Sequence, residues 1–184
     1  DGAAYHSYGG SPVELDNIHK QAPEKNLYFT EQSIGTWNYQ SFGQSLMSEM
    51  KNTCIGTVTR WCKAVIVWNF MLDENGGPHG GPGACATCYG AVDISSKDYT
   101  TLNKRSHYYV IGHLSKALKA GSTRIATSGY MPTGLSAVAS ENPDGTYGLV
   151  LFNENAEGLT FIIEHNGKHF EIKLPAESIT SCIL

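Results

Sequence analysis

The sequence predicts a chain in two parts, an α/β part followed by an all-β part. Over residues 1–120, helix-like segments alternate with short apolar segments, which is typical of parallel α/β structure. Residues 121–184 instead hold short alternating segments separated by turn signals, which is typical of an antiparallel β-sandwich. We therefore expect one domain over residues 1–120 and a second over residues 121–184.

The α/β part opens with a helix start signal. Ser11 is a favourable N-cap residue and Pro12 suits the first helical position. Because Pro23 disfavours helical geometry in the residue before it, we expect this helix to end near Gln21. A short apolar strand is expected next, over residues 26–30.

Two further helices and one strong strand complete the α/β part. Apolar residues at helical spacing predict a helix over residues 39–52. Residues 64–70 are nearly continuously apolar, as in a parallel strand that is covered on both faces. A Gly- and Pro-rich loop is expected over residues 73–90, and a helix over residues 103–118, ended by Gly121.

The all-β part is predicted from turn signals and alternation. Asn166-Gly167 is a strong two-residue hairpin signal, and residues 142–145 read as a turn. The expected strands are 124–127, 135–140, 147–153, 160–165, 169–174 and 178–183.

Composition limits the class of protein. With 184 residues, 41% of them apolar, the chain can bury a core and is not a disordered tail. A net charge of −4 without a basic stripe argues against a nucleic-acid partner. We expect no membrane-spanning helix, because no run of about 18 apolar residues occurs. The first residues lack the charged and apolar regions of a signal peptide.

Five cysteines leave at least one unpaired within the chain. Cys85 and Cys88 form a C-x-x-C, which raises zinc and redox interpretations. A second ligand pair is missing and the motif follows a Gly-rich run, so a loop disulfide or two plain thiols are favoured. We expect neither a metal nor another cofactor.

Polar and aromatic residues follow two of the expected strands. Glu31 comes after the strand over residues 26–30, and Trp68 and Asn69 stand at the end of the later strand. In an α/β barrel, reactive residues stand at the carboxyl ends of strands. A carboxylate beside an aromatic ring and an amide suits a sugar site, where the carboxylate can attack an anomeric carbon. The alternatives are a solvated carboxylate and a tryptophan that packs in the core.

Several motifs in order resemble glycoside hydrolase family 30, which includes glucosylceramidases, β-1,6-glucanases and β-xylosidases. The resemblance covers essentially the whole chain. Its motifs are His6-Ser7-Tyr8, the segments 27–35, 67–78, 89–94 and 108–116, and the β-sandwich from Gly121 onward.

The resemblance implies site residues one by one. Glu31 matches the catalytic nucleophile at the end of barrel strand seven. The residues implied to bind substrate are His6, Tyr8, Trp37, Trp68 and Asn69. A structural histidine at His6 and a surface aromatic at Trp37 remain the alternative interpretations.

The resemblance also implies the fold and the reaction. The expected fold is the C-terminal part of a (β/α)₈ TIM barrel, about strands six to eight, followed by an antiparallel β-sandwich. The expected reaction is retaining hydrolysis of a β-linked glycoside or glucan, in a protein that is extracellular or periplasmic. Asn153-Glu154 is the one Asn-Glu pair and falls in the expected sandwich, so the family's general acid/base is not found.

Barrel strands one to five would then precede Asp1, and residues 1–184 alone would be inactive. Its expected partner is the missing barrel portion or a second copy of itself. The Gly-rich run over residues 79–85 departs from the glucosylceramidase pattern and argues against ceramide-linked substrates. The alternative function is a non-catalytic carbohydrate-binding or interaction fragment.

Overall fold

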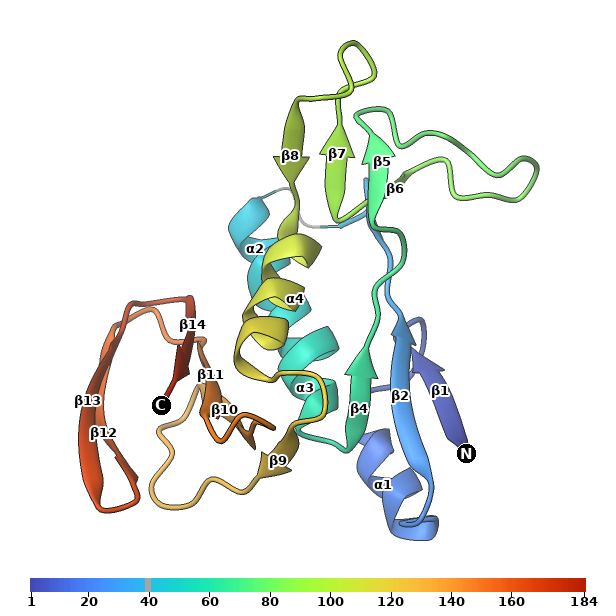
Figure 1. Ribbon diagram of the computed structural model, residues 1–184. Helices are drawn as coiled ribbons and strands as arrows, with labels where there is room; N and C mark the ends of the chain where they lie inside the picture. Colours follow the sequence, from blue (N-terminus) through green and yellow to red (C-terminus); the bar gives the residue numbers. More distant parts are fainter. Residues whose placement is uncertain (39–40) are drawn as a thin grey trace. The chain divides into compact units, whose positions relative to one another are not determined.

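The computed structural model describes residues 1–38 and 41–184 (Figure 1). It contains two compact units, Asp1–Gly112 and His113–Leu184. Helix α4, Ser106–Ala117, runs across the boundary between them. The expected domain boundary after residue 120 stays a prediction. Within the described ranges, no helix has both the length and the hydropathy needed to cross a membrane.

Parallel strands joined by helices form the centre of the first unit. The strand order is β1-β2-β4, and both neighbouring pairs are parallel. The three strands are β1 (Gly2–His6), β2 (Asn26–Glu31) and β4 (Cys62–Val65). The connecting helices are α1 (Glu14–Gln21), α2 (Phe42–Glu49), η1 (Met50–Ile55) and α3 (Gly56–Val58). This alternation is the one that the sequence predicts for residues 1–120.

Helix α1 packs its apolar side on the parallel sheet. Leu15 and Ile18, three residues apart on the helix, lie against Leu27 and Phe29 of β2. The helix ends at Gln21 as predicted, but it begins at Glu14 instead of Ser11. The residues before Glu14 form a turn, in which the Glu14 N–H donates to the Ser11 carbonyl at 3.0 Å.

The second helical segment is longer than the sequence predicts. It begins at Phe42, where the Ser41 hydroxyl accepts a hydrogen bond from the Gln44 N–H, and runs without a break to Val58. The expected start at residues 39–40 lies outside the described residues. The extension beyond Asn52 buries the whole stretch over residues 53–57.

The expectation of a doubly covered strand over residues 64–70 is wrong. Regular strand β4 ends at Val65, and the side chain of Phe70 is 66% exposed. Parallel pairing continues irregularly, because the Ile66 N–H donates to the Phe29 carbonyl at 2.8 Å. Asn69 then adopts a left-handed backbone with φ of 59°, which ends the extended conformation.

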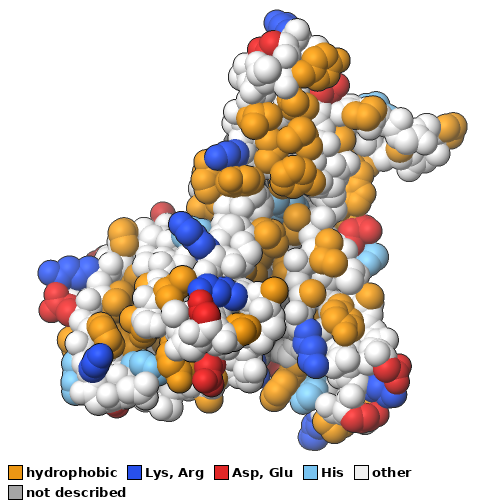
Figure 2. Space-filling model, in the orientation of Figure 1, with side chains coloured by type: hydrophobic (Ala, Val, Ile, Leu, Met, Phe, Trp, Pro, Cys, Tyr) orange, Lys and Arg blue, Asp and Glu red, His pale blue; other side chains and the backbone are white. Residues whose placement is uncertain are grey.

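Five short strands occur where the sequence does not predict strands, and of these only β6 lies wholly within the loop expected over residues 73–90. They are β3 (Ile34–Gly35), β5 (Met71–Asp73), β6 (Cys88–Tyr89), β7 (Val92–Ile94) and β8 (Leu102–Lys104). Helix α4 begins at Ser106 instead of residue 103, because β8 pairs with β7. Strands β5, β7 and β8 form one sheet, and hydrophobic side chains are exposed over it (Figure 2). Leu102 of β8 is one of the exposed residues.

The second unit contains the six strands that the sequence predicts, each within about two residues at either end. Four form one antiparallel sheet in the order β14-β11-β10-β9, and β12 and β13 form a hairpin. The bounds are β9 Thr123–Ile125, β10 Leu135–Glu141, β11 Tyr147–Asn153, β12 Leu159–His165, β13 Lys168–Leu174 and β14 Ser178–Ile183. Leu135, Leu149, Leu151 and Leu174 form the buried core between the two sheets.

Candidate active site

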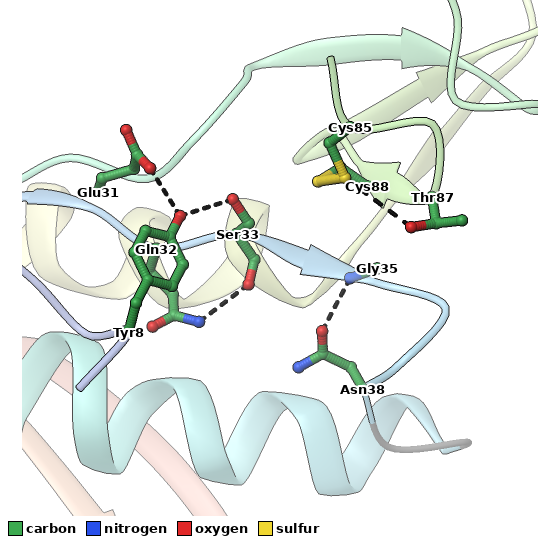
Figure 3. Close-up of a disulfide and its surroundings, with 9 residues drawn as sticks. All are labelled: Tyr8, Glu31, Gln32, Ser33, Gly35, Asn38, Cys85, Thr87 and Cys88. Carbon is green, nitrogen blue, oxygen red and sulfur yellow. Dashed lines mark hydrogen bonds between the residues drawn. A yellow bond between two sulfur atoms is a disulfide. The ribbon is translucent and has the colours of Figure 1, made fainter. Parts of the chain in front are cut away.

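Glu31 ends strand β2, at the edge where the parallel strands finish. Across the sheet, His6 at the end of β1 is its register partner. The Tyr8 hydroxyl donates a hydrogen bond to Glu31 Oε1 at 2.8 Å, and His6 Nδ1 lies 3.9 Å from the same oxygen. The structure therefore brings three of the predicted site residues together. Figure 3 shows the Tyr8 hydroxyl hydrogen-bonded to both Glu31 and Ser33.

Ser33 is part of this cluster although the sequence reasoning did not select it. Its hydroxyl lies 2.8 Å from the Tyr8 hydroxyl, and its side chain is buried. Side chains two residues apart on an extended chain point to the same side, so Ser33 shares the side of Glu31. That alternation is the signal that could have found it.

Burial raises the pKa of Tyr8, and the neighbouring Glu31 carboxylate raises it further against the opposing effect of the Ser33 hydroxyl. The phenol is therefore neutral near neutral pH and donates to the carboxylate. The side chain of Glu31 is 35% exposed, so the oxygen atoms remain reachable from solvent.

Trp68 and Asn69 lie shortly after the end of β4, which stops at Val65. The Trp68 N–H donates to the Gln32 carbonyl at 3.0 Å, which places this backbone directly beside the residue after Glu31. Asn69 Oδ1 accepts from the Met71 N–H at 3.1 Å. The side chain of Asn69 is therefore engaged in the local turn that ends the strand.

Trp37 lies in the turn that follows β3. It is 55% exposed and lines a cavity whose described lining includes neither Glu31 nor Tyr8. The same lining includes Ser7, which stands between His6 and Tyr8, and Gln32, which follows Glu31, so the cavity with Trp37 borders the Glu31 cluster.

The C-x-x-C motif is a disulfide, which corrects the zinc and thiol interpretations. Cys85 and Cys88 are bonded at an S–S distance of 2.08 Å. Burial raises the pKa of the free Cys62 thiol to about 11, which keeps it unreactive. In the described part of the chain, no group of three or more His, Cys, Asp or Glu side chains could hold a metal ion.

The first unit has parallel strands joined by helices, with polar groups at the carboxyl ends of the strands, and a β-sandwich follows it. This combination defines the C-terminal part of a barrel protein with an added sandwich domain. The comparisons with known proteins show what this arrangement is similar to. Residues 121–182 match the family described as "Glycosyl hydrolase family 30 beta sandwich domain". The chain is similar to the C-terminal portion of members of this family.

Curated relatives align along almost the whole chain. The endo-1,6-β-D-glucanase BGN16.3 of Trichoderma harzianum is 30% identical over 193 residues, which covers 98% of this chain and 36% of the relative. The putative glucosylceramidase 3 of Caenorhabditis elegans is 28% identical over 202 residues, and this alignment covers 100% of this chain and 36% of the relative. The chain therefore spans little more than a third of the curated relatives it matches.

Solved structures show the same arrangement. The endo-β1,6-glucanase BT3312 is 50% identical, with a TM-score of 0.93 over 98% of this chain and 40% of that protein. SrfJ from Salmonella typhimurium, at 22% identity and a TM-score of 0.86, shares the fold. These matches confirm the expected fold class, the C-terminal part of a TIM barrel followed by an antiparallel β-sandwich.

Proposed function

We propose that this chain is the C-terminal part of a retaining β-glycosidase and that Glu31 is its catalytic nucleophile. One observation carries the proposal. The Glu31 carboxylate stands at the carboxyl end of a parallel strand, held at 2.8 Å by the Tyr8 hydroxyl and still partly open to solvent. Barrel enzymes place their reactive groups at this end of the strands.

The proposed reaction has two steps. A Glu31 oxygen bonds to the anomeric carbon of the sugar while the glycosidic bond breaks and a second carboxylic acid gives its proton to the departing oxygen. The resulting carboxylate then takes a proton from water, whose oxygen replaces Glu31 on the anomeric carbon and frees the sugar. Tyr8 orients the attacking carboxylate before the first step, and the hydrogen bond is released as the charge on Glu31 disappears. His6 and Trp68 would flank the bound sugar.

The second carboxylic acid is proposed to come from barrel strands outside this chain. The one Asn-Glu pair, Asn153-Glu154, follows the sandwich strand β11. Asn153 is fully buried, and its amide donates to the carbonyls of Glu157 and Pro175 at 3.0 and 2.8 Å. Its side chain is engaged in holding a loop, as expected for a structural residue. The 184-residue chain alone should therefore be inactive.

The proposed substrate is a β-1,6-glucan. BT3312 and the Trichoderma harzianum relative are both described as endo-1,6-β-glucanases, the former at 50% identity. The Gly-rich run over residues 79–85 departs from the glucosylceramidase pattern and supports the same choice. The Cys85–Cys88 disulfide favours an extracellular or periplasmic location, because disulfides persist in oxidising compartments.

The proposed partner of residues 1–120 is the rest of a barrel. In the described residues, β1 and β4 each have one neighbouring strand and form the two edges of the sheet. An unpaired parallel edge offers free N–H and C=O groups to another strand. We propose that five further barrel strands complete it, and that without them the chain associates with itself.

A chimera tests the nucleophile. This chain would replace the corresponding 40% of BT3312, which supplies the remaining barrel, and hydrolysis of β-1,6-glucan would be measured. We expect an active chimera in which Glu31→Gln lowers kcat by about 10⁴-fold or more, because removal of a nucleophile has effects of that order. Glu24→Gln, at an exposed carboxylate that precedes the opposite end of β2 from Glu31, is the matched control and should retain activity.

A 2-deoxy-2-fluoro-glucosyl fluoride identifies the residue directly. Mass spectrometry of the labelled chimera should place the sugar on Glu31, and a label on any other residue would sink the assignment. The chain alone, assayed with aryl β-glycosides, should give no turnover. Hydrolysis by the chain alone that is abolished by Glu31→Ala would contradict the proposed division of the two carboxyl groups. Binding of glucan by an inactive chimera would favour the alternative, a non-catalytic carbohydrate-binding fragment.

A further inference from the structure

Ser33 is the most deeply buried residue of the Glu31 cluster, and the reaction proposed above gives it no part. Its exposed fraction is 8%, against 58% for Tyr8. Its hydroxyl lies 2.8 Å from the Tyr8 hydroxyl, which in turn donates to Glu31 Oε1 at 2.8 Å (Figure 3). A side chain this buried is poorly placed to touch a sugar, so an effect of Ser33 on the reaction would have to pass through Tyr8.

The number of protons fixes the direction of these two hydrogen bonds. The neutral Tyr8 phenol has one proton, and it donates that proton to the Glu31 carboxylate, which has none to offer. The Tyr8 oxygen can then only accept from the Ser33 hydroxyl. The two bonds form one chain, from Ser33 through Tyr8 to the charged oxygen of Glu31. Burial raises the pKa of Tyr8, and the Ser33 hydroxyl opposes that rise, as expected of a group that donates to the phenol oxygen.

The backbone around Ser33 is held on both sides. Before it, the Gln32 carbonyl accepts from the Trp68 N–H at 3.0 Å. After it, Ile34 pairs with Tyr89 in the β3–β6 ladder. The Ser33 carbonyl itself accepts from Gln32 Nε2 at 2.9 Å. The Ser33 hydroxyl therefore stands on a well-fixed segment of the chain.

Tyr8, in contrast, stands on an exposed loop after β1, and the two residues that follow it are glycines. Its ring meets the ring of His6 edge-on, with the centroids 5.9 Å apart. Within the described residues, its hydroxyl is hydrogen-bonded to Glu31 and Ser33. The side chain of Glu31 is itself 35% exposed, so of the two partners only Ser33 is buried. The position of the phenol is therefore set from the Ser33 side.

We propose that Ser33 is a positioning residue whose hydroxyl holds Tyr8 in place and directs the phenol proton to Glu31. The inference rests on the proposed function, because it assigns Ser33 to the same reaction. A hydroxyl that accepts a hydrogen bond becomes a stronger donor, so donation from Ser33 also strengthens the bond from Tyr8 to Glu31. The attacking carboxylate oxygen is thereby oriented before it meets the anomeric carbon. Ser33 forms no bond to the sugar and keeps its own proton throughout.

Kinetics of the BT3312 chimera test this role. Ser33→Ala should lower kcat for β-1,6-glucan about tenfold, which corresponds to about 1.4 kcal/mol for the lost hydrogen bond. KM should stay within about twofold, because Ser33 does not touch the sugar. Ser106→Ala is the matched control, since Ser106 is a buried serine of the same unit whose hydroxyl has no hydrogen-bond partner in the described part of the chain. The control should keep the activity of the unaltered chimera.

A double-mutant cycle with Tyr8→Phe separates positioning from a merely structural role. If Ser33 acts through Tyr8, Ser33→Ala should change kcat by less than about twofold in the Tyr8→Phe background, because the phenol hydroxyl is already absent. The pH profile is a second readout. Loss of the Ser33 donation weakens the bond to Glu31, so the acid limb of kcat/KM should move to higher pH by about half a unit in Ser33→Ala. His6, a further titratable group beside Glu31, is unaltered in every variant.

The outcomes separate this inference from the proposed function. A tenfold loss that disappears in the Tyr8→Phe background, together with the shift of the acid limb, supports it. Equal rates for Ser33→Ala and the unaltered chimera, or a loss that multiplies with that of Tyr8→Phe, overturn it while a sugar label on Glu31 still supports the nucleophile. Full activity of Glu31→Gln overturns both. If the chimera has no activity, the same cycle is read from urea midpoints, where a coupled loss supports the inference and an additive loss overturns it.

Discussion

The two units bury their cores in different ways. The sandwich unit packs a four-stranded antiparallel sheet against a hairpin, and its leucine core includes a residue from each of β10, β11 and β13. The first unit has a three-stranded parallel sheet, and helix α1 packs on it with Leu15 and Ile18. A parallel sheet is normally covered on both faces. The difference indicates that the sandwich carries most of what it needs to fold, whereas the parallel sheet needs additional chain.

The largest effect expected from this difference concerns independent folding. A chain of residues 106–184, which keeps helix α4 whole, should unfold cooperatively and reversibly in urea. Residues 1–105 alone should self-associate, because both edge strands and exposed hydrophobic side chains remain uncovered. Analytical ultracentrifugation and urea unfolding would check both. If residues 1–105 were monodisperse and unfolded cooperatively, the expected difference between the two units would be wrong.

A matched pair of core leucines tests the difference between the two units more closely. Leu27 in β2 and Leu151 in β11 are both 2% exposed. Leucine-to-alanine changes in cores cost about 2–5 kcal/mol, and the cost is smaller where the surroundings can collapse into the space. We expect Leu151→Ala to lie near the upper end of that range and Leu27→Ala near the lower end, each measured in the unfolding transition of its own unit. Equal costs would mean that the parallel sheet is as tightly constrained as the sandwich.

A buried amide at the end of α4 gives a smaller expected effect. Asn142 is 3% exposed, donates to the Ala117 carbonyl at 3.1 Å and accepts from the Lys119 N–H at 3.1 Å. Asn142→Ala leaves these groups without a partner, which costs about 1–3 kcal/mol. The control Asn17→Ala, on the exposed side of α1, should change the free energy of unfolding by less than about 0.5 kcal/mol. A loss no larger than that of the control would show that water replaces the amide.

The smallest effect is a pH dependence within the sandwich unit. Burial lowers the pKa of His113, with a further contribution from Lys116, and its Nδ1 lies 2.5 Å from the Ser181 hydroxyl. The unfolded chain therefore binds a proton more readily than the folded one. The resulting stabilisation is present above the unfolded pKa of about 6.5 and is lost as the pH falls below it. Urea midpoints between about pH 7.5 and about pH 5.5 should fall less in His113→Gln than in the unaltered chain; an unchanged slope would assign the acid sensitivity to other groups.

Local sequence signals predicted the sandwich well. Its strands pair mostly with neighbours in sequence, and Asn166-Gly167 forms the turn between β12 and β13. The signals failed where distant segments decide the structure. The strand over residues 64–70 was expected to be continuous, but the turn at Asn69 and pairing of residues 91–92 with residues 69–70 divide it.

The sequence by itself determined the order of elements, the place of Glu31 at a strand end and the resemblance to a known family, because these depend on short motifs and periodicity. Only the tertiary structure decided which side chains meet. It joined Tyr8 to Glu31 and Ser33, engaged Asn69 in its own turn and placed Trp37 on a cavity that Ser7 and Gln32 also line. The reason is that parallel strands are paired across long crossovers, so the meeting of their ends is fixed by packing of the whole sheet and not by neighbouring residues.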